Sequence, residues 1–509
     1  MRTRTRTRRL QLEILEDRCM PSTFAAFDLG NPDSGPFPSD RFTVADSSQL
    51  TGRRVDLPLP NAATRPSDYA DLGVINTLDG FNLQPRLSIP FSGPINVSTV
   101  NSSTVFLIKL ADPTAPKESV GQVIGINQTV WDVATKTLHV ESDALLEQHT
   151  RYALIVTRGI RDADGQPVEA SDAFARFRHD LNFGQTHDPA LKEYRKDLLD
   201  AMKAARGAGV AAKDIVTASV FTTMSVTATL EKMRDQIHAA TPAPADFLLG
   251  AGGARTVYDL SGVSSITFNR QTQVVGPLSP VPVPVSLLRA IPGVVGTVAF
   301  GKYVSPDYQV HAGEYIPPIA TRTGAPVVQA MKEVYFNLFL PAGPAPAGGW
   351  PVALFGHSSG PMGNKNDDPL RVAASNAAHG IATIAINIAG FGFGSLSTLT
   401  VNQAAGAPVT FLAGGRSIDQ NGDGTIGSGE GQFAAGSRTI IGETDALRQS
   451  AADLMQMMRV IQVGMDVDGN GSADLNPSRI LYLGLSFGAS LGMMLFAVEP
   501  GVRAGAFNV

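Results

Sequence analysis

The chain has 509 residues, of which 43% are hydrophobic and 17% charged, and its formal net charge is −5. A chain of this length buries more than one hydrophobic core, so we expect two or three domains. The thin negative charge offers no basic surface for nucleic acid, and no run of about 18 apolar residues could span a membrane. The single cysteine, Cys19, excludes an intramolecular disulfide framework.

Residues 1–22 form an arginine-rich segment that lacks the apolar core of a secretory signal peptide. Such a segment can be a solvated basic tail or one that contacts an anionic partner. The arginine run followed by Leu12-Glu13-Ile14-Leu15-Glu16-Asp17-Arg18 resembles a short N-terminal leader of exported surface proteins in environmental bacteria. The resemblance implies export to an extracellular or cell-surface location.

Residues 23–183 are rich in Pro, Gly, Ser and Thr and contain short β-type runs. Runs at this spacing, separated by turn residues, predict an all-β sandwich. Segments 90–95, 104–110 and 151–165 resemble the paired strands and closing hairpin of a bacterial Ig-like domain of surface proteins. Because a fold alone supplies no site, a spacer or positioning role is favoured over a specific binding role.

Three further short segments, at 37–42, 55–58 and 76–81, resemble the N-terminal region of the bacterial virulence-factor lipase family. None of them carries a catalytic residue. The resemblance implies a lipase or esterase that acts on a small ester or a lipid.

The composition changes after this region. Leu and Met residues at helical spacing in 184–244 predict a helical connector with two helices. Residues 245–330 are rich in Pro and Gly, with Val and Phe runs between 274 and 304, and predict a β-rich lead-in to the next domain.

From residue 331 to residue 509, strands and helices alternate along the sequence. We expect strands at 352–355, 381–386, 480–483 and 502–509, and helices at 370–378, 443–461 and 489–496. Alternation predicts a parallel sheet with crossover helices. This is the α/β-hydrolase arrangement, in which strand 480–483 is the fifth in the usual count.

The sequence Gly484-Leu485-Ser486-Phe487-Gly488 lies between that strand and the following helix. A nucleophile elbow needs small residues at Gly484 and Gly488, because the turn is sharp and holds the serine in a strained conformation. Ser486 is the candidate nucleophile. The N–H of Phe487 lies at a helix N-terminus and is a candidate oxyanion donor.

A second loop, His357-Ser358-Ser359-Gly360, follows the strand at 352–355. It resembles the His-Gly-type oxyanion loop, with Ser where Gly is usual. The N–H of Ser358 or of Ser359 is then the second oxyanion donor, and the sequence does not choose between them. In such a loop His357 orients the turn and is not the base.

An insertion within this domain contains the pattern of a twelve-residue calcium loop at 419–430. A hard cation needs several oxygen ligands around a sharp glycine turn, and the constrained positions are satisfied. The expected ligands are Asp419, Asn421, Asp423, Thr425 and Glu430, and the flanks show no EF-hand helices. The alternative is a solvated Asp/Gly turn.

A weaker loop of the same kind lies at 466–474, with Pro477 where a glutamate should close the site. Its candidate ligands are Asp466, Asp468, Asn470 and Asp474. Any bound Ca²⁺ in either loop is expected to be structural, because nothing brings it to a substrate. The second loop leads into the strand that carries Ser486, so a cation there would fix the elbow indirectly.

The catalytic triad poses a contradiction. In this fold the chain order is Ser, then Asp or Glu, then His. The residues after Ser486 contain neither Asp nor His, Glu499 lies at the far end of the next helix, and all eight histidines precede the serine. We therefore expect the hydrolase domain to be C-terminally incomplete and this chain alone to be inactive. Two functions stay open: a serine ester hydrolase, and a non-catalytic, calcium-stabilised surface or adhesion protein.

Overall fold

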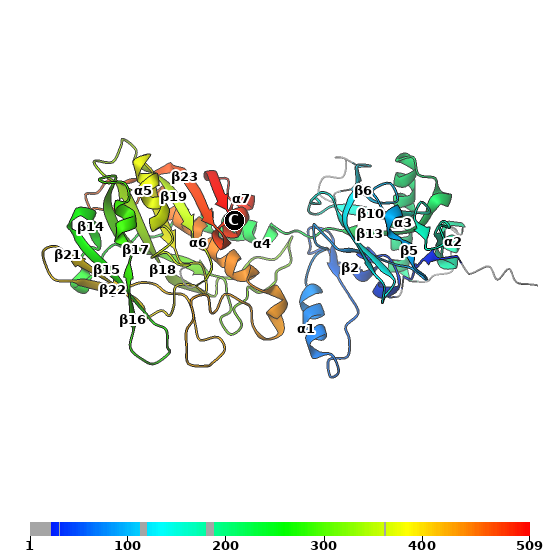
Figure 1. Ribbon diagram of the computed structural model, residues 1–509, viewed down its shortest axis with the longest axis horizontal. Helices are drawn as coiled ribbons and strands as arrows, with labels where there is room; N and C mark the ends of the chain where they lie inside the picture. Colours follow the sequence, from blue (N-terminus) through cyan, green and yellow to red (C-terminus); the bar gives the residue numbers. More distant parts are fainter. Residues whose placement is uncertain (1–21, 30, 112–119, 180–187, 361–362) are drawn as a thin grey trace, which may run out of the picture. The chain divides into compact units, whose positions relative to one another are not determined.

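The computed structural model describes residues 22–29, 31–111, 120–179, 188–360 and 363–509 (Figure 1). These residues form two compact units. Unit 1 contains the described residues up to Pro58 together with Leu78–Ser225, and unit 2 contains Leu59–Thr77 and Val226–Val509. The predicted leader, apart from Ser22, lies outside the described residues.

Unit 1 is built on two main sheets with the strand orders β13-β10-β6-β7 and β4-β9-β8. Their strands are β4 (Leu87–Pro90), β6 (Val105–Ala111), β7 (Val123–Ile124), β8 (Ile126–Asp132), β9 (Thr137–Ser142), β10 (Arg151–Thr157) and β13 (Ile215–Thr222). Three short pairs complete the unit: β1 (Phe24–Ala25) with β12 (Glu169–Ala170), β2 (Thr43–Ala45) with β3 (Arg53–Val55), and β5 (Ile95–Asn96) with β11 (Arg161–Asp162).

Helices α2 (Asp172–His179) and α3 (Pro189–Gly207) also belong to unit 1. One apolar face of α3, which includes Tyr194, Leu198 and Met202, packs on the sheet of β6, β10 and β13. The unit is therefore not all-β, and 184–244 is not a connector. The first helix of the 184–244 segment, α3, and strand β13 complete unit 1. The second helix of the segment, α4 (Ala228–Ala239), packs in unit 2.

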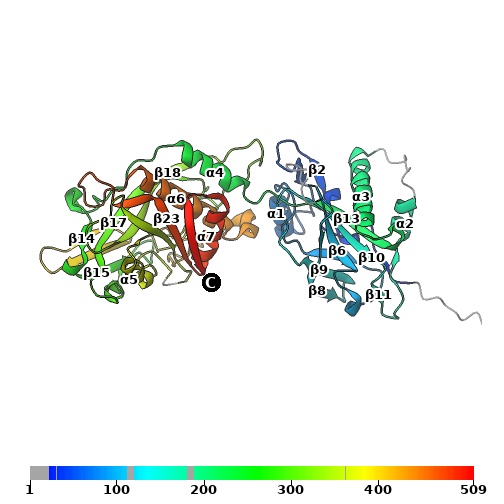
Figure 2. The same cartoon turned by 90° about the horizontal axis from the view of Figure 1, so that it is seen from above.

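Unit 2 contains a seven-stranded sheet with the order β14-β17-β18-β20-β19-β23-β24 (Figure 2). Its strands are β14 (Val257–Asp259), β17 (Val295–Asp307), β18 (Ala330–Pro341), β19 (Trp350–Gly356), β20 (Ala382–Ile386), β23 (Leu475–Leu485) and β24 (Val502–Asn508). β20, β19, β23 and β24 pair in parallel, as predicted, whereas β14, β17 and β18 pair antiparallel. The sheet is mixed, and β23 is the fifth strand counted from β17.

The predicted boundary at residue 331 separates β17 from its own sheet. β17 and β18 pair along their whole lengths, from Val295 opposite Pro341 to Asp307 opposite Ala330. The segment 245–330 is therefore part of unit 2. The sequence did not predict the pairing of β17 with β18, because Pro- and Gly-rich residues separate the two strands.

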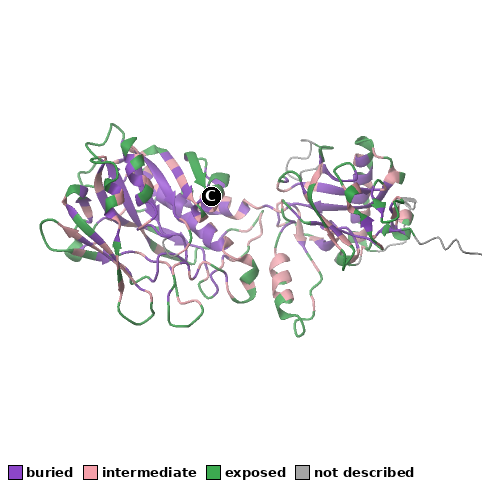
Figure 3. Cartoon of the chain, in the orientation of Figure 1, coloured by how far each residue is buried: buried purple, intermediate pink, exposed green. Residues whose placement is uncertain are grey.

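Helices and a second sheet cover the two faces of the large sheet. One core joins it to α4, α6 (Thr444–Val463) and α7 (Phe487–Val498). The other core joins it to α5 (Leu370–Ala378) and to the sheet β16-β15-β21-β22. The strands of that sheet are β15 (Val263–Arg270), β16 (Ser279–Val283), β21 (Thr398–Gln403) and β22 (Val409–Leu412). Figure 3 shows that the strands between these layers are buried.

The remaining helix, α1 (Pro66–Ile75), lies beside the turn Gly436–Ile441 within unit 2. Among the described residues, no helix combines the length and the apolar character that crossing a bilayer requires.

A buried ion pair ties the insertion of unit 2 to its core. Arg416 Nη2 lies 2.7 Å from Asp453 Oδ2 on α6, outside hydrogen-bond angles, and Asp453 is completely buried. The other carboxylate oxygen accepts from the Ser305 hydroxyl at 2.7 Å and from Gln449 Nε2 at 3.0 Å. Arg416 Nη1 donates to the carbonyl of Asn387 at 2.9 Å. Arg416 is thus the direct ion-pair partner of Asp453, and the largely buried Lys332 adds a longer-range attraction.

We expect Arg416→Met to lower the free energy of unfolding by about 3–5 kcal/mol, because it leaves a buried carboxylate without its counter-ion. Adding Asp453→Asn should recover more than half of that loss, which urea unfolding of the single and double variants measures. Equal stability of the single and double variants would contradict this account of the pair.

Candidate active site

Ser486 lies in the turn between β23 and α7. Its backbone has φ 51° and ψ −115°, a left-handed conformation that is rare for a residue other than glycine, and its side chain is exposed. Residues held in such conformations concentrate at functional sites, because the surrounding structure must compensate for the strain. The predicted strand, strained serine and helix are all present in the structure.

Three glycines allow the elements around this turn to approach closely. Gly356 at the end of β19 lies opposite Gly484 in the pairing with β23. A Cβ atom on Gly488 would collide with the backbone of Gly356, and one on Gly484 would meet the carbonyl of Gly488 and the backbone of Ala489. β19, β23 and the first turn of α7 therefore touch backbone to backbone, which places the end of β19 beside Ser486.

The backbone groups of the turn have separate partners. The Ser486 N–H donates to the carbonyl of Asn508 on β24 at 2.6 Å, and the Ser486 carbonyl accepts from the Ala489 N–H at 2.7 Å. Phe487 is the first residue of α7, where an N–H has no acceptor within the helix. This N–H is therefore free of bonds within the helix.

His357 is fully buried in the loop after β19. Its Nδ1 donates to the carbonyl of Ser358 at 2.7 Å and its Nε2 accepts from the N–H of Ile388 at 2.9 Å, so the ring is neutral with the proton on Nδ1. Burial lowers the pKa of His357 to about 4. Its ring contacts Phe391, which in turn contacts Phe487. His357 orients the loop and has no nitrogen free to act as a base.

The two candidate serines of this loop differ in their contacts. The N–H and the hydroxyl of Ser358 both donate to Asp368 Oδ2, at 2.8 and 2.6 Å, and Asp368 is buried. Ser359 is exposed. Sequence reasoning missed Asp368, although an acidic residue before Pro369 and a helix is a recognisable signal of a helix start.

No hydrogen bond joins Ser486 to a histidine within the described ranges. His311 is exposed, but Asp307 holds its Nε2 at 2.8 Å and Glu314 holds its Nδ1 at 3.0 Å. These two bonds raise the pKa of His311 to about 9, which keeps the ring protonated and unfit as a base. His238 bonds to the buried Glu499 at 2.7 Å, at the opposite end of α7 from Ser486.

The loop at 419–430 folds around its own acidic side chains. The Asp419 carboxylate accepts from the N–H groups of Gly422, Asp423 and Gly424 at 2.8 to 3.1 Å. Glu430 closes the loop by accepting from the N–H groups of Gln420 and Gly427. The centre of the loop pairs with residues 272–274 instead of with a second calcium loop.

The weaker loop at 466–474 repeats this pattern of hydrogen bonds. Asp466 accepts from the N–H groups three, four and five residues ahead, as Asp419 does. Carboxylate oxygens of Asp466, Asp468 and Asp474 lie within 4.8 Å of one another, the only such group of three or more acidic, His or Cys residues in the described part of the chain. Asn470 Nδ2 donates to Asp468 at 2.9 Å. Arg255 donates to the Val467 carbonyl at 2.8 Å, so one cation already touches this loop.

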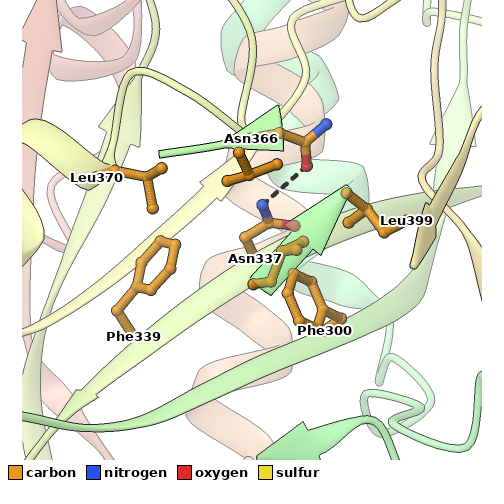
Figure 4. Close-up of a pocket in the computed structure, with 8 residues that line it drawn as sticks. Phe300, Asn337, Phe339, Asn366, Leu370 and Leu399 are labelled. Carbon is orange, nitrogen blue, oxygen red and sulfur yellow. Dashed lines mark hydrogen bonds between the residues drawn. The ribbon is translucent and has the colours of Figure 1, made fainter. Parts of the chain in front are cut away.

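A small pocket lies between the large sheet and the second sheet of unit 2 (Figure 4). Mostly apolar side chains line it, and Asn337 donates to Asn366 Oδ1 at 2.9 Å beside it. Its volume of about 10 Å³ accommodates roughly one water molecule, so it is not an acyl-binding pocket.

Residues 74–179 match the bacterial Ig-like domain family. The predicted Ig-like domain is confirmed over these residues, of which 78–179 lie in unit 1. No curated protein matches the chain.

Among solved structures, acetyl xylan esterase 1 from a Thermoanaerobacterium species is similar with a TM-score of 0.26 and 11% identity, over 55% of this chain and 56% of that one. The rice cell wall degrading esterase from Xanthomonas oryzae gives a TM-score of 0.21 and 14% identity, over 52% and 49%. An acetyl xylan esterase from a Paenibacillus species gives 0.22 and 15%, over 42% and 49%. The chain spans about half the length of each, and these scores are too low to carry an argument.

His357 makes the stability of unit 2 depend on pH. Its pKa is about 4 when folded and near 6.5 when unfolded, so the unfolded chain binds more protons between these values. Stability therefore falls as the pH drops from 6.5 toward 4. Between pH 7 and 4.5 we expect the wild type to lose about 2–3 kcal/mol more than a His357→Asn variant, measured by urea unfolding. Parallel pH profiles of the two proteins would contradict the assignment.

Proposed function

We propose that unit 2 is the catalytic part of a serine ester hydrolase of the lipase or esterase type, with Ser486 as its nucleophile. The observation that carries the proposal is the left-handed backbone of Ser486 between a buried strand and a helix, at the fifth strand of the sheet. The close approach of Gly488 to Gly356 supports it, because that contact puts an oxyanion loop beside the serine.

In the proposed reaction, Ser486 Oγ attacks the ester carbonyl carbon and gives its proton to a general base. The carbonyl oxygen becomes an oxyanion, which the Phe487 N–H and an N–H of the 358–359 loop stabilise. Collapse of the intermediate breaks the bond to the alcohol, which takes up the proton and leaves an acyl ester on Ser486. Water, deprotonated by the same base, then releases the acid and restores the serine.

We assign no base and no acidic partner among the described residues, because no histidine there bonds Ser486. β24 is an edge strand of the sheet, and its residues 503–508 are exposed. Apolar side chains at this edge are exposed as well, including Met493, Phe496 and Phe507.

The substrate is proposed to be a small ester or a lipid, and the protein to be exported to the outside or the surface of the cell. The leader-like sequence at 1–22 and the Ig-like domain support export, since such domains occur in bacterial surface proteins. In this proposal the Ig-like unit holds the hydrolase unit at the surface and does not take part in the reaction.

We also propose that the loops at 419–430 and 466–474 bind structural Ca²⁺. All their candidate ligands are oxygen atoms, which is the donor set that this cation prefers. The shared pattern of internal hydrogen bonds supports a common role. In the second loop Asp474 supplies the ligand that Pro477 cannot.

The nucleophile is tested with a fluorophosphonate probe and a short-chain p-nitrophenyl ester. The protein should be labelled at one serine, and Ser486→Ala should abolish the labelling. Because no described histidine bonds Ser486, ester hydrolysis should be about 10⁶-fold slower than with a complete serine triad, the cost of losing the base. Persistent labelling of Ser486→Ala would contradict the assignment, and absence of labelling in the wild type would favour the non-catalytic surface protein.

The calcium proposal predicts a stabilisation by mass action. With a dissociation constant of about 10⁻⁴ M, 10 mM Ca²⁺ should add roughly 2.7 kcal/mol per occupied loop to the free energy of unfolding. Glu430→Gln should reduce the gain from the first loop and Asp466→Asn that from the second. Mg²⁺ serves as the control cation, and an equal gain in the wild type and the double variant would show that neither loop is the site.

A further inference from the structure

The contacts of the 357–369 segment identify a residue that positions the oxyanion loop. The peptide groups on both sides of Ser358 have hydrogen-bond partners. His357 Nδ1 holds the Ser358 carbonyl at 2.7 Å, and Asp368 holds the Ser358 N–H at 2.8 Å. Because Ser358 is fixed at both ends, the next peptide group, that of Ser359, has a fixed orientation.

Asp368 is itself held in a rigid segment. Residues 363–366 are buried, and a Cβ atom on Gly363 would collide with the Ser358 carbonyl, so the two strands of the loop lie in contact. The Lys365 ammonium donates to Asn337 Oδ1 on β18 at 2.7 Å, and the Lys365 N–H donates to Asn387 Oδ1, just after β20, at 3.0 Å. These bonds of Lys365 attach the segment that carries Asp368 to the large sheet.

We propose that Asp368 is the positioning residue of the oxyanion loop and that the second oxyanion donor is the N–H of Ser359. This inference rests on the proposed function. It excludes Ser358 as the donor on chemical grounds, because its N–H already donates to a carboxylate. A carboxylate that shared this N–H with an oxyanion would also place a second negative charge beside it, which opposes the reaction.

The two candidate donors, Ser358 and Ser359, lead to opposite expectations for the reaction rate of Ser486 in the Asp368→Ala variant. If Ser359 is the donor, Asp368→Ala frees the loop and slows the reaction of Ser486. If Ser358 is the donor, Asp368→Ala releases its N–H and removes a repelling charge, so the reaction becomes faster or stays the same.

The experiment measures phosphonylation of Ser486 in the 509-residue chain by intact mass and peptide mapping, at pH 9 and over hours, since no base assists the serine. We expect Asp368→Ala to lower the saturating rate by at least about tenfold, toward the 10² that removal of one oxyanion donor costs, with the half-saturating probe concentration little changed. Asp368→Asn, which keeps one acceptor oxygen for Ser358, should recover part of the rate.

A control variant separates positioning from general damage. Asp367→Asn alters the neighbouring carboxylate, which bonds Asn364 and not Ser358, and should label at the wild-type rate. Thermal melts confirm that every variant is folded at the assay temperature.

The outcomes distinguish the inference about Asp368 and Ser359 from the proposed role of Ser486 as the nucleophile. Labelling of the wild type with an unchanged or faster Asp368→Ala variant overturns the inference and leaves Ser486 as the nucleophile. A wild type that is not labelled at Ser486 overturns the proposed function, and the inference with it. If Asp368→Ala does not fold, Asp368→Asn decides by the same criterion.

Discussion

The structure of unit 2 depends on one close contact between backbones. Gly356 and Gly488 touch without side chains between them, and Gly484 allows the chain to turn from β23 into α7 in the same small space. Any Cβ at these positions would push α7 away from the sheet. The contact fixes three things at once: the left-handed serine, the start of the helix whose first N–H is free of intrahelical bonds, and the position of the 357–359 loop beside both.

The rest of the unit stabilises this contact by packing buried side chains around it, and these side chains take no part in the proposed reaction. His357, Phe391 and Phe487 form a chain of rings from the oxyanion loop to the first residue of α7. The buried polar groups nearby, Lys365 and Asp368 among them, are bonded to backbone or to amide side chains. A buried polar group costs free energy unless it is paired, so these bonds also specify one conformation of the loop.

The sequence predicted the parts of this site that are local. The elbow, α5, α6 and the strands around them follow from short patterns in which glycine spacing and apolar periodicity agree. It did not predict the contacts that join distant segments. β15 pairs with β21 across more than a hundred residues, and β13 lies between two helical patterns with all eight of its residues buried, so it shows no alternation. Asp368 was missed for a similar reason, since its role appears only when its carboxylate meets Ser358.

The domain boundaries were misplaced where a composition change did not coincide with a change of core. The Pro- and Gly-rich residues 245–330 carry β17, which is the second strand from one edge of the seven-stranded sheet. The helices predicted at 184–244 are present but belong to different units. Composition reports where loops are frequent, whereas a domain is defined by the apolar side chains that pack together, as those of α3 and α4 do in separate cores.

The central claim is that Ser486 and the 357–359 loop form one site that stabilises a tetrahedral oxyanion. The most direct measurement is a crystal structure of the protein after reaction with a small alkyl fluorophosphonate. The account predicts a phosphonyl group on Ser486 Oγ whose free oxygen accepts from the N–H groups of Phe487 and Ser359, with Ser358 still bonded to Asp368. A phosphonyl group on another residue, or one on Ser486 whose oxygen points to solvent, would contradict it.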